Sequence, residues 1–103
     1  MKERSIVVTQ GNINNNHLYL RNVLPMFPSG CIGGSNRKEQ ASQLITLYLQ
    51  GADTVQCDID GKKKIFRDRK AIRQFLGNND IAALDEVLIR KIGLYEYQIS
   101  KIQ

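Results

Sequence analysis

The sequence predicts a mostly β domain with two short helices, arranged as a barrel or a sandwich. Three observations predict it: apolar and polar residues alternate with period two in several short segments, helix signals are few, and 103 residues suit one core. Hydrophobic residues make up 42% of the chain and charged residues 24%, the balance of a globular protein. We therefore expect residues 1–103 to form a single domain.

Seven segments are expected to form strands. Leu18 and Leu20 share one face of their segment, and alternation in the fourth segment places Cys57 inward and Asp58 outward. The segment at 44–49 is apolar on both faces, which is typical of a central, buried strand. In chain order, the expected strands are residues 5–9, 17–21, 44–49, 54–59, 64–67, 86–92 and 94–102.

Two helical segments interrupt the strands. Asp68 is a suitable N-cap for a helix over residues 69–76, which carries an apolar stripe at helical spacing and is expected to end at Gly77. A shorter helical turn is expected over residues 22–27, limited to one or two turns by Pro25 and Pro28. Two long polar segments are expected to be loops, at residues 10–16 and 29–42.

The positive charge is concentrated in one segment. The chain has a formal net charge of +5, but residues 62–73 alone sum to +6 and the other residues to −1. A run of charge is often only a solvated face. Here the charges lie on both a turn and a helix and repel one another unless an anion neutralises them, and phosphate is the usual partner. Nucleic acid is therefore the expected partner.

Several classes of protein are not expected. No apolar run approaches the roughly 18–20 residues of a membrane span, and the first residues lack the apolar core of a signal peptide, so a cytoplasmic location is expected. Cys31 and Cys57 lack a metal-site spacing and are expected to stay reduced. His17 is the only histidine, so we predict neither a metal site nor a cofactor.

Two polar loops are candidate contact segments. The segment 10–17 holds four asparagines in five positions, and asparagine amides can pair with adenine in the major groove, although an ordinary turn is the alternative. The glycine-rich segment 29–38 could hold a phosphate through backbone N–H groups or be a mobile loop. It contains neither a Walker motif nor a dinucleotide-binding glycine motif, so nucleotide hydrolysis is not predicted.

A metal-dependent nuclease is a weaker interpretation. Asp53, Asp60 and Lys62 have an order in which two carboxylates could hold a metal while the lysine orients a water. Asp60 and Gly61, however, form a dipeptide typical of hairpin turns, and no third carboxylate follows on a helix.

The order of several motifs resembles a known family. NNNHLYLRNVLPMFP, IGG, CDIDGKKKIFRDR, RQFL and LDEVLIRKIGLYEYQI follow one another as in the DNA-binding pseudobarrel domains. These comprise the plant B-three transcription-factor domains and bacterial relatives that serve as recognition or effector domains of restriction endonucleases and other restriction-modification proteins. The resemblance covers about residues 6–102 and is closer to the bacterial members. The chain departs from the pattern at Lys70-Ala71, where relatives have Gly-Trp, and at Leu84-Asp85, where they have Gly-Asp.

The resemblance implies a seven-stranded open β-barrel with two short helices, which binds the DNA major groove with two arms. The N-terminal arm would be residues 10–17 and the C-terminal arm residues 58–64. Base-reading residues would be Asn12, Asn14, Asn15, Asn16, His17, Asp58, Asp60 and Lys62. Residues that contact the DNA backbone would be Arg21, Asn36, Arg37, Lys38, Lys63, Lys64, Arg67, Arg69, Lys70 and Arg73.

The expected function is sequence-specific binding of double-stranded DNA without catalysis, in a restriction-modification setting. A nuclease or methyltransferase domain would be supplied by the same or a partner chain. The alternative is a protein-interaction module that does not bind DNA, with the metal-dependent nuclease third. RNA binding is a further possibility, for which Tyr19, Phe66, Tyr95 and Tyr97 are the only candidate stacking surfaces.

Overall fold

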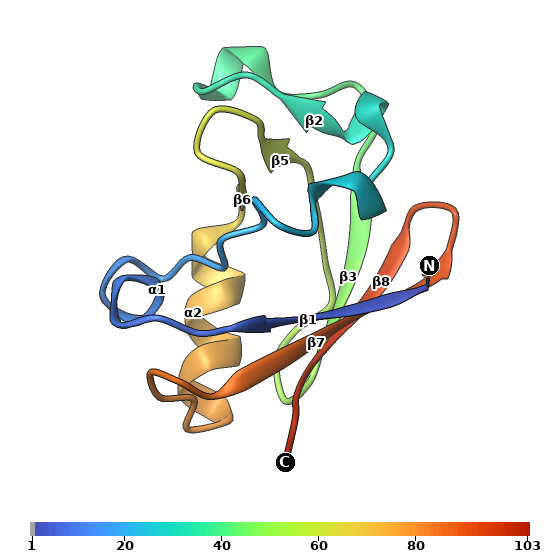
Figure 1. Ribbon diagram of the computed structural model, residues 1–103. Helices are drawn as coiled ribbons and strands as arrows, with labels where there is room; N and C mark the ends of the chain where they lie inside the picture. Colours follow the sequence, from blue (N-terminus) through green and yellow to red (C-terminus); the bar gives the residue numbers. More distant parts are fainter. Residues whose placement is uncertain (1) are drawn as a thin grey trace.

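Two β-sheets of unequal size enclose the apolar core of the protein, as seen in a computed structural model that describes residues 2–103 (Figure 1). The large sheet has the strand order β1-β7-β8-β3-β4 and the small sheet the order β2-β5-β6. The strands are β1 (Glu3–Val7), β2 (Ile32–Gly33), β3 (Ile45–Leu49), β4 (Val55–Cys57), β5 (Ile59–Asp60), β6 (Ile65–Phe66), β7 (Glu86–Gly93) and β8 (Glu96–Lys101).

Strand pairing shows an open architecture. Neighbours in the large sheet are antiparallel except β3 and β8, which run parallel. In the small sheet β2 is parallel to β5, and β5 and β6 form a hairpin. Strands β1 and β4 end the large sheet, and within residues 2–103 the two sheets do not close into a barrel. The protein is thus a small, mostly β fold with two α-helices, as predicted at this coarser level.

Helix α2 (Arg69–Asn78) confirms the prediction of a helix after Asp68. The Asp68 carboxylate accepts a hydrogen bond from Ala71 N at 3.0 Å, which satisfies a free donor of the first turn. The helix does not end at Gly77 as expected but continues to Asn78. Asn79 is its C-cap and donates its backbone N–H to Phe75 O. No helix of residues 2–103 is long and apolar enough to cross a membrane.

Helix α1 (Gln10–Asn15) corrects the expectation of a loop over residues 10–16. Thr9 and Asn12 form a reciprocal capping box: Thr9 Oγ1 accepts from Asn12 N at 3.2 Å, and Asn12 Oδ1 accepts from Thr9 N at 2.7 Å. Asn16 ends the helix in the left-handed conformation, with φ of 56°. The cap therefore offsets the poor helix propensity of one glycine and several asparagines.

The remaining helical pieces are single 3-10 turns. The first of them confirms the turn expected over residues 22–27, and the other two lie in the segment expected to be a loop over residues 29–42. They are η1 (Leu24–Met26), η2 (Ser29–Cys31) and η3 (Arg37–Glu39).

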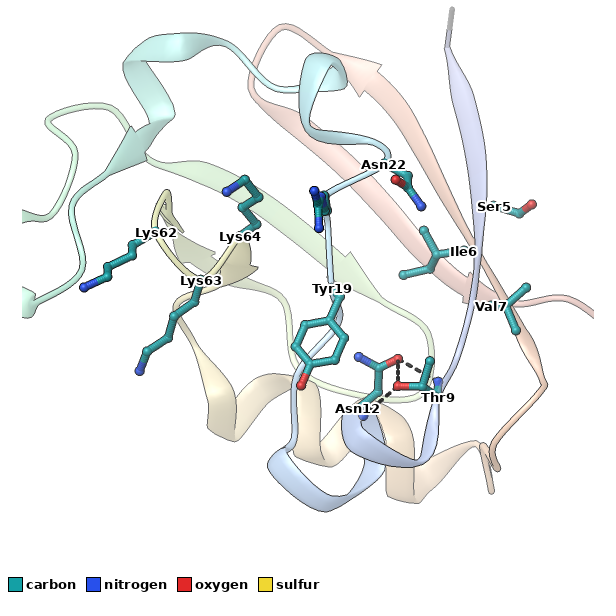
Figure 2. A pocket seen from close by; sticks show the side chains of 11 residues that line it. Ser5, Ile6, Val7, Thr9, Asn12, Tyr19, Asn22, Lys62, Lys63 and Lys64 are labelled. Carbon is teal, nitrogen blue, oxygen red and sulfur yellow. Dashed lines mark hydrogen bonds between the residues drawn. The ribbon is translucent and has the colours of Figure 1, made fainter.

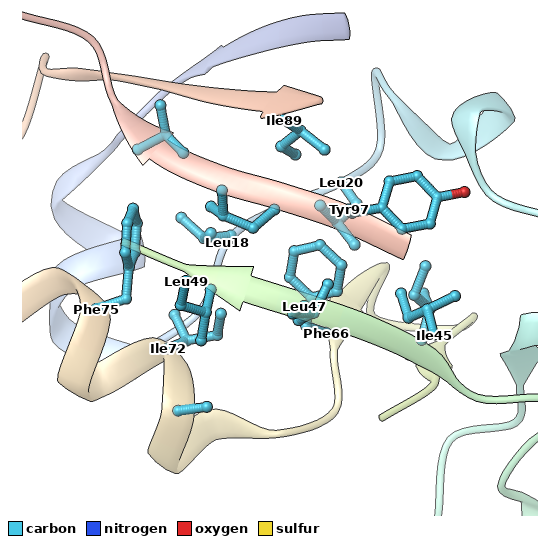
Figure 3. Close-up of a cluster of buried hydrophobic side chains, with 14 of the residues drawn as sticks. Leu18, Leu20, Ile45, Leu47, Leu49, Phe66, Ile72, Phe75, Ile89 and Tyr97 are labelled. Atoms are coloured by element: carbon cyan, nitrogen blue, oxygen red, sulfur yellow. The ribbon is translucent and has the colours of Figure 1, made fainter. Parts of the chain in front are cut away.

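The core lies between the large sheet, α2 and the segment at residues 17–20 (Figure 3). On β3, Ile45, Leu47 and Leu49 are buried, whereas Tyr48 is exposed. The expectation that this strand is buried on both faces is therefore wrong: the strand is central in its sheet, but only one face of that sheet is covered.

The segment at residues 17–21 follows the predicted alternation without forming a full strand. Leu18 and Leu20 are buried, and Tyr19 between them is exposed. Only one isolated bridge, from Tyr19 to Ile65, joins the segment to β6. Leu20 N also donates to Lys64 O at 2.8 Å, so the segment is anchored beside the β5–β6 hairpin.

Asp58 lies where the chain passes from the large sheet to the small one, between β4 and β5. It is only 1% exposed, so the prediction that it points outward is wrong. The alternation of residues 54–59 breaks here because one strand does not continue through the segment.

Leu84 takes the left-handed conformation at the turn before β7, with φ of 78°. This is the position at which the pseudobarrel pattern has glycine. Leu84 N donates to Val8 O at 2.7 Å, and Asp85 Oδ2 accepts from Ala82 N at 2.9 Å. These contacts hold a leucine in a backbone conformation that suits glycine.

Candidate nucleic-acid interface

A groove of about 650 Å³ runs between β1, α1 and the turn of the β5–β6 hairpin (Figure 2). The fold brings the lining residues together from the first 22 residues of the chain and from the turn at residues 62–64. They are Ser5, Ile6, Val7, Thr9, Asn12, Tyr19, Arg21, Asn22, Lys62, Lys63 and Lys64.

The lining of this groove is strongly positive. Arg21 and the three lysines at positions 62–64 contribute cations, and no aspartate or glutamate lines the groove. Lys62 and Lys63 are exposed, whereas Lys64 is half-buried and takes the left-handed conformation with φ of 58°. The groove thus has the charge expected for binding a polyanion.

Asp60 holds the lysine turn in shape. Its carboxylate accepts from Lys62 N at 3.0 Å and Lys63 N at 2.9 Å, and its backbone oxygen accepts from Lys64 N at 2.7 Å. The side chain is 4% exposed. The expectation that Asp60 faces a DNA base is therefore wrong. Its buried carboxylate caps the turn and holds the backbone of the lysines in place.

Asp58 and Arg67 are likewise occupied within the protein. Arg67 Nε lies 2.6 Å from Asp58 Oδ1, and Arg67 Nη2 lies 3.1 Å from Asp58 Oδ2. Arg67 also donates to the carbonyls of Gly34 and Asn36, while Ala41 N donates to Asp58 at 2.8 Å. The bond to Asp58 raises the pKa of Arg67. Asp58, expected to read a base, is buried and paired within the protein, so that expectation is wrong. Arg67, expected to contact the DNA backbone, has its guanidinium bound within the protein, and its contact with DNA stays a prediction.

The asparagines of α1 divide into two groups. Asn14 and Asn15 are exposed, with Asn14 accepting from Gln10 Nε2 and Asn15 donating to Gly11 O. Asn16 serves as the C-cap and Asn12 as part of the N-terminal capping box. Only the exposed pair presents amides to a neighbouring molecule without rearrangement.

Two buried nitrogens in this region have no hydrogen-bond partner within residues 2–103. They are Asn12 Nδ2 and His17 Nε2. Burial lowers the pKa of His17, and the positive charges of Arg69 and Lys63 lower it further, which favours the neutral ring. The imidazole packs edge-on against Tyr19, with ring centroids 5.9 Å apart.

A second groove of about 620 Å³ lies between η3 and the start of α2. Arg37, Arg69 and Lys70 line it, together with the paired Asp58 and Arg67. Arg69 donates to Asn15 O at 3.0 and 3.3 Å, which ties the start of α2 to the end of α1. The other expected backbone contacts lie outside both grooves: Asn36 caps η3, and Lys38 and Arg73 are exposed.

The glycine-rich segment is used internally rather than as an open phosphate cradle. Gly34 N donates to Glu39 O at 2.8 Å, and Gly34 O accepts from Arg67. A Cβ at Gly33 would lie 2.5 Å from Glu39 O, so the segment is packed against its own backbone. No ready phosphate site is formed at Gly34.

The sequence did not identify several residues that line the first groove. Thr9, Asn22 and the β1 residues were missed, because their place depends on the pairing of β1 with the distant β7. The capping-box spacing of Thr9 and Asn12 is the signal that could have identified α1. Of the four candidate stacking residues, Tyr19 is exposed at the groove, whereas Phe66 and Tyr97 are buried.

The acidic and thiol side chains form no metal-binding cluster in the part of the chain that the structure describes. Asp53 is exposed at the β3–β4 turn, while Asp60 is buried in its own hairpin. Both cysteines are buried free thiols, and burial raises the pKa of Cys57 to about 12.

No family model, curated protein or solved structure was found to match the chain. The groove, its positive charge and the unpaired nitrogen of Asn12 in its lining are the features that bear on function.

Proposed function

We propose that the protein binds double-stranded DNA in a sequence-specific manner and does not itself catalyse a reaction. The observation that carries this proposal is the gathering of four cations without a carboxylate along one groove. Cations at this density attract phosphates and release their counterions, which supplies affinity. The exposed amides of Asn14 and Asn15 lie on α1, whose Asn12 lines the same groove, and supply groups that can read base edges.

In this proposal the groove walls act as two arms. One arm is α1 and the other is the turn at residues 61–64, and Arg69 and the Leu20–Lys64 bond tie them to the body of the protein. Lys62 and Lys63 contact phosphates together with Arg21, while Asn14 and Asn15 contact bases. The acids Asp58 and Asp60 are left out of this assignment because both are buried.

We further propose that the fold is a pseudobarrel of the bacterial restriction-modification type. Support comes from the order of the elements: strand-rich segments, a short helix at each arm, and a left-handed residue at position 84 where the family pattern has glycine. In that setting the domain recognises a DNA site for a nuclease or methyltransferase domain in the same or a partner chain.

The test is a titration of fluorescein-labelled duplexes, drawn from a random pool, followed by fluorescence anisotropy. If four phosphates are neutralised, affinity should fall by about two orders of magnitude when salt is raised from about 50 to about 200 mM. Selection of bound duplexes from the pool should then enrich one sequence. Absence of duplex binding at the lower salt, or binding that does not respond to salt, would overturn the proposal.

A further inference from the structure

The first groove is more enclosed and more apolar than phosphate contacts require. Exposed cations at the edge of the groove are enough to bind phosphates. The walls of the groove nevertheless include apolar surface from Ile6, Val7 and Tyr19. Val7 and Tyr19 are among the exposed large hydrophobic residues. The volume, about 650 Å³, falls within the range of about 300–1,000 Å³ typical of pockets that hold small molecules.

An unpaired donor lies at the inner end of this groove. Asn12 is 1% exposed and its Nδ2 has no hydrogen-bond partner within residues 2–103. Its orientation is fixed, because Oδ1 on the other side of the amide accepts from Thr9 N at 2.7 Å. Figure 2 shows the nitrogen pointing toward Tyr19, on the groove side. A buried donor without an acceptor is costly, so this atom is poised for an acceptor that a ligand brings.

Tyr19 controls the approach to that nitrogen. Tyr19 is 41% exposed, so its ring is accessible from the groove. Gly11 leaves room beside it, since a Cβ there would lie 3.5 Å from the tyrosine oxygen, an ordinary contact distance. Access of a ligand to Asn12 Nδ2 requires this ring to rotate, and the partly exposed ring can offer a flat face to an incoming aromatic group.

We infer that the groove accepts one unstacked nucleobase. The base stacks on Tyr19, a carbonyl oxygen or ring nitrogen of the base accepts a hydrogen bond from Asn12 Nδ2, and the attached phosphate lies among the lysines of the β5–β6 turn. This inference rests on the proposed binding of DNA in the same groove. The base comes either from a position extruded from the duplex or from a nucleotide that already lacks a partner, and extrusion is easiest where pairing is absent.

Three labelled duplexes of one sequence test the inference by fluorescence anisotropy. One is fully paired, one carries a single bulged thymidine, and one carries a bulged abasic site with the same backbone. The two bulged duplexes carry the same backbone and equal phosphate charge, so the ratio of their affinities reports the effect of the bulged base. We expect the thymidine bulge to bind about tenfold more tightly than the abasic bulge, the size of one base–aromatic stack.

Three variants connect this ratio to the two residues. Tyr19→Phe keeps the aromatic ring and should leave the affinity ratio of the thymidine to the abasic bulge unchanged. Tyr19→Leu keeps an apolar side chain without a ring and should reduce this ratio to near one. Asn12→Asp keeps the oxygen that caps Thr9 and replaces the donor by an acceptor, so it should also abolish the ratio. Any general loss of affinity from the added negative charge cancels between the two bulged duplexes.

The outcomes separate this inference from the proposed function. Equal affinity for the two bulged duplexes, or a ratio that survives both Tyr19→Leu and Asn12→Asp, overturns the inference while binding to the paired duplex still stands. Binding of the thymidine bulge without binding of the paired duplex supports the base site and overturns duplex recognition.

Discussion

The Asp58 carboxylate and the Arg67 guanidinium form a two-pronged ion pair at the junction of the two sheets, with nitrogen–oxygen distances of 2.6 and 3.1 Å. The same guanidinium donates to two carbonyls of the segment that leads into η3. One side-chain pair therefore joins the β4–β5 junction, the residue after β6 and the glycine-rich segment.

Removing the carboxylate from this pair should destabilise the protein. Asp58→Ala leaves Arg67 without its partner in a largely buried position, and the free energy of unfolding should fall by about 3–5 kcal/mol. Urea unfolding followed by circular dichroism measures this change. A variant as stable as the parent would show that the pair is not structural, and would return Asp58 to the set of residues available for DNA contact.

Neutralising the two exposed lysines of the hairpin turn should weaken binding of all duplexes alike. Lys62→Gln with Lys63→Gln removes two phosphate contacts, so the slope of log affinity against log salt should decrease by about 2. Lys2→Gln with Arg90→Gln is the matched control, because it removes the same charge from a different groove. Equal losses from the two double variants would contradict a role for the turn.

Truncating the exposed asparagines of α1 should relax sequence discrimination rather than remove affinity. Asn14→Ala or Asn15→Ala should reduce discrimination at one base pair by about 1–3 kcal/mol, measured as the affinity ratio between the selected site and its single-base variants. Neither side chain is buried, so the stability of the fold should change little. Unchanged ratios at every position would remove α1 from base recognition.

Leu84→Gly should stabilise the protein. Leu84 is 83% exposed and has a φ of 78°, so the substitution loses little packing and relieves a backbone strain of about 1–2 kcal/mol. The greater freedom of glycine in the unfolded chain offsets part of this gain, leaving about 0.5–1 kcal/mol. A rise in the urea midpoint without a change in slope would confirm it, and a fall would show that the leucine is held favourably.

Alkaline pH should destabilise the protein through two buried groups. Burial raises the pKa of Tyr97 from 10.0 to about 12 and that of Cys57 from 9.0 to about 12. The folded state therefore keeps protons that the unfolded state loses, so the stabilisation is complete below about pH 9 and is lost as pH rises toward 12. Unfolding free energies at about pH 8 and about pH 11 measure this, and a flat profile would contradict it.

A tyrosine-to-phenylalanine change separates the two groups. Tyr97→Phe should remove the decrease in unfolding free energy that starts near pH 10. The decrease due to Cys57 should remain. The substitution also leaves Met26 O without the hydroxyl that now donates to it at 2.7 Å, so a general loss of about 1–3 kcal/mol at neutral pH should accompany it.

Local signals in the sequence predicted the elements whose contacts are local. Asp68 and the apolar stripe after it located α2, and period-two alternation located the strands β7 and β8. Helix α1 was predicted as a loop, because its asparagines have weak helix propensity and the stabilising contact is the reciprocal cap between Thr9 and Asn12.

The candidate site was predicted only in part, because some of its features depend on contacts between segments that are distant in the sequence. The lysines of the turn and Arg21 were named as candidate DNA contacts because charge is visible in the sequence, and the structure brings them to one groove. Their contact with DNA stays a prediction. The burial of Asp58 was missed, because a strand that changes sheets breaks the alternation on which inside and outside were assigned. Partners such as Arg67 and Ala41 become apparent only once the segments are packed together.

Arg69 bonds to the last carbonyl of α1, and Leu20 bonds to the last lysine of the turn. The two walls of the first groove are thus braced at their bases against the same small body, and the aperture between them has a set width. If the groove binds DNA as we propose, a duplex whose groove width does not match this spacing should bind less tightly. The proposed DNA binding would then discriminate by the shape and stiffness of DNA as well as by its base edges.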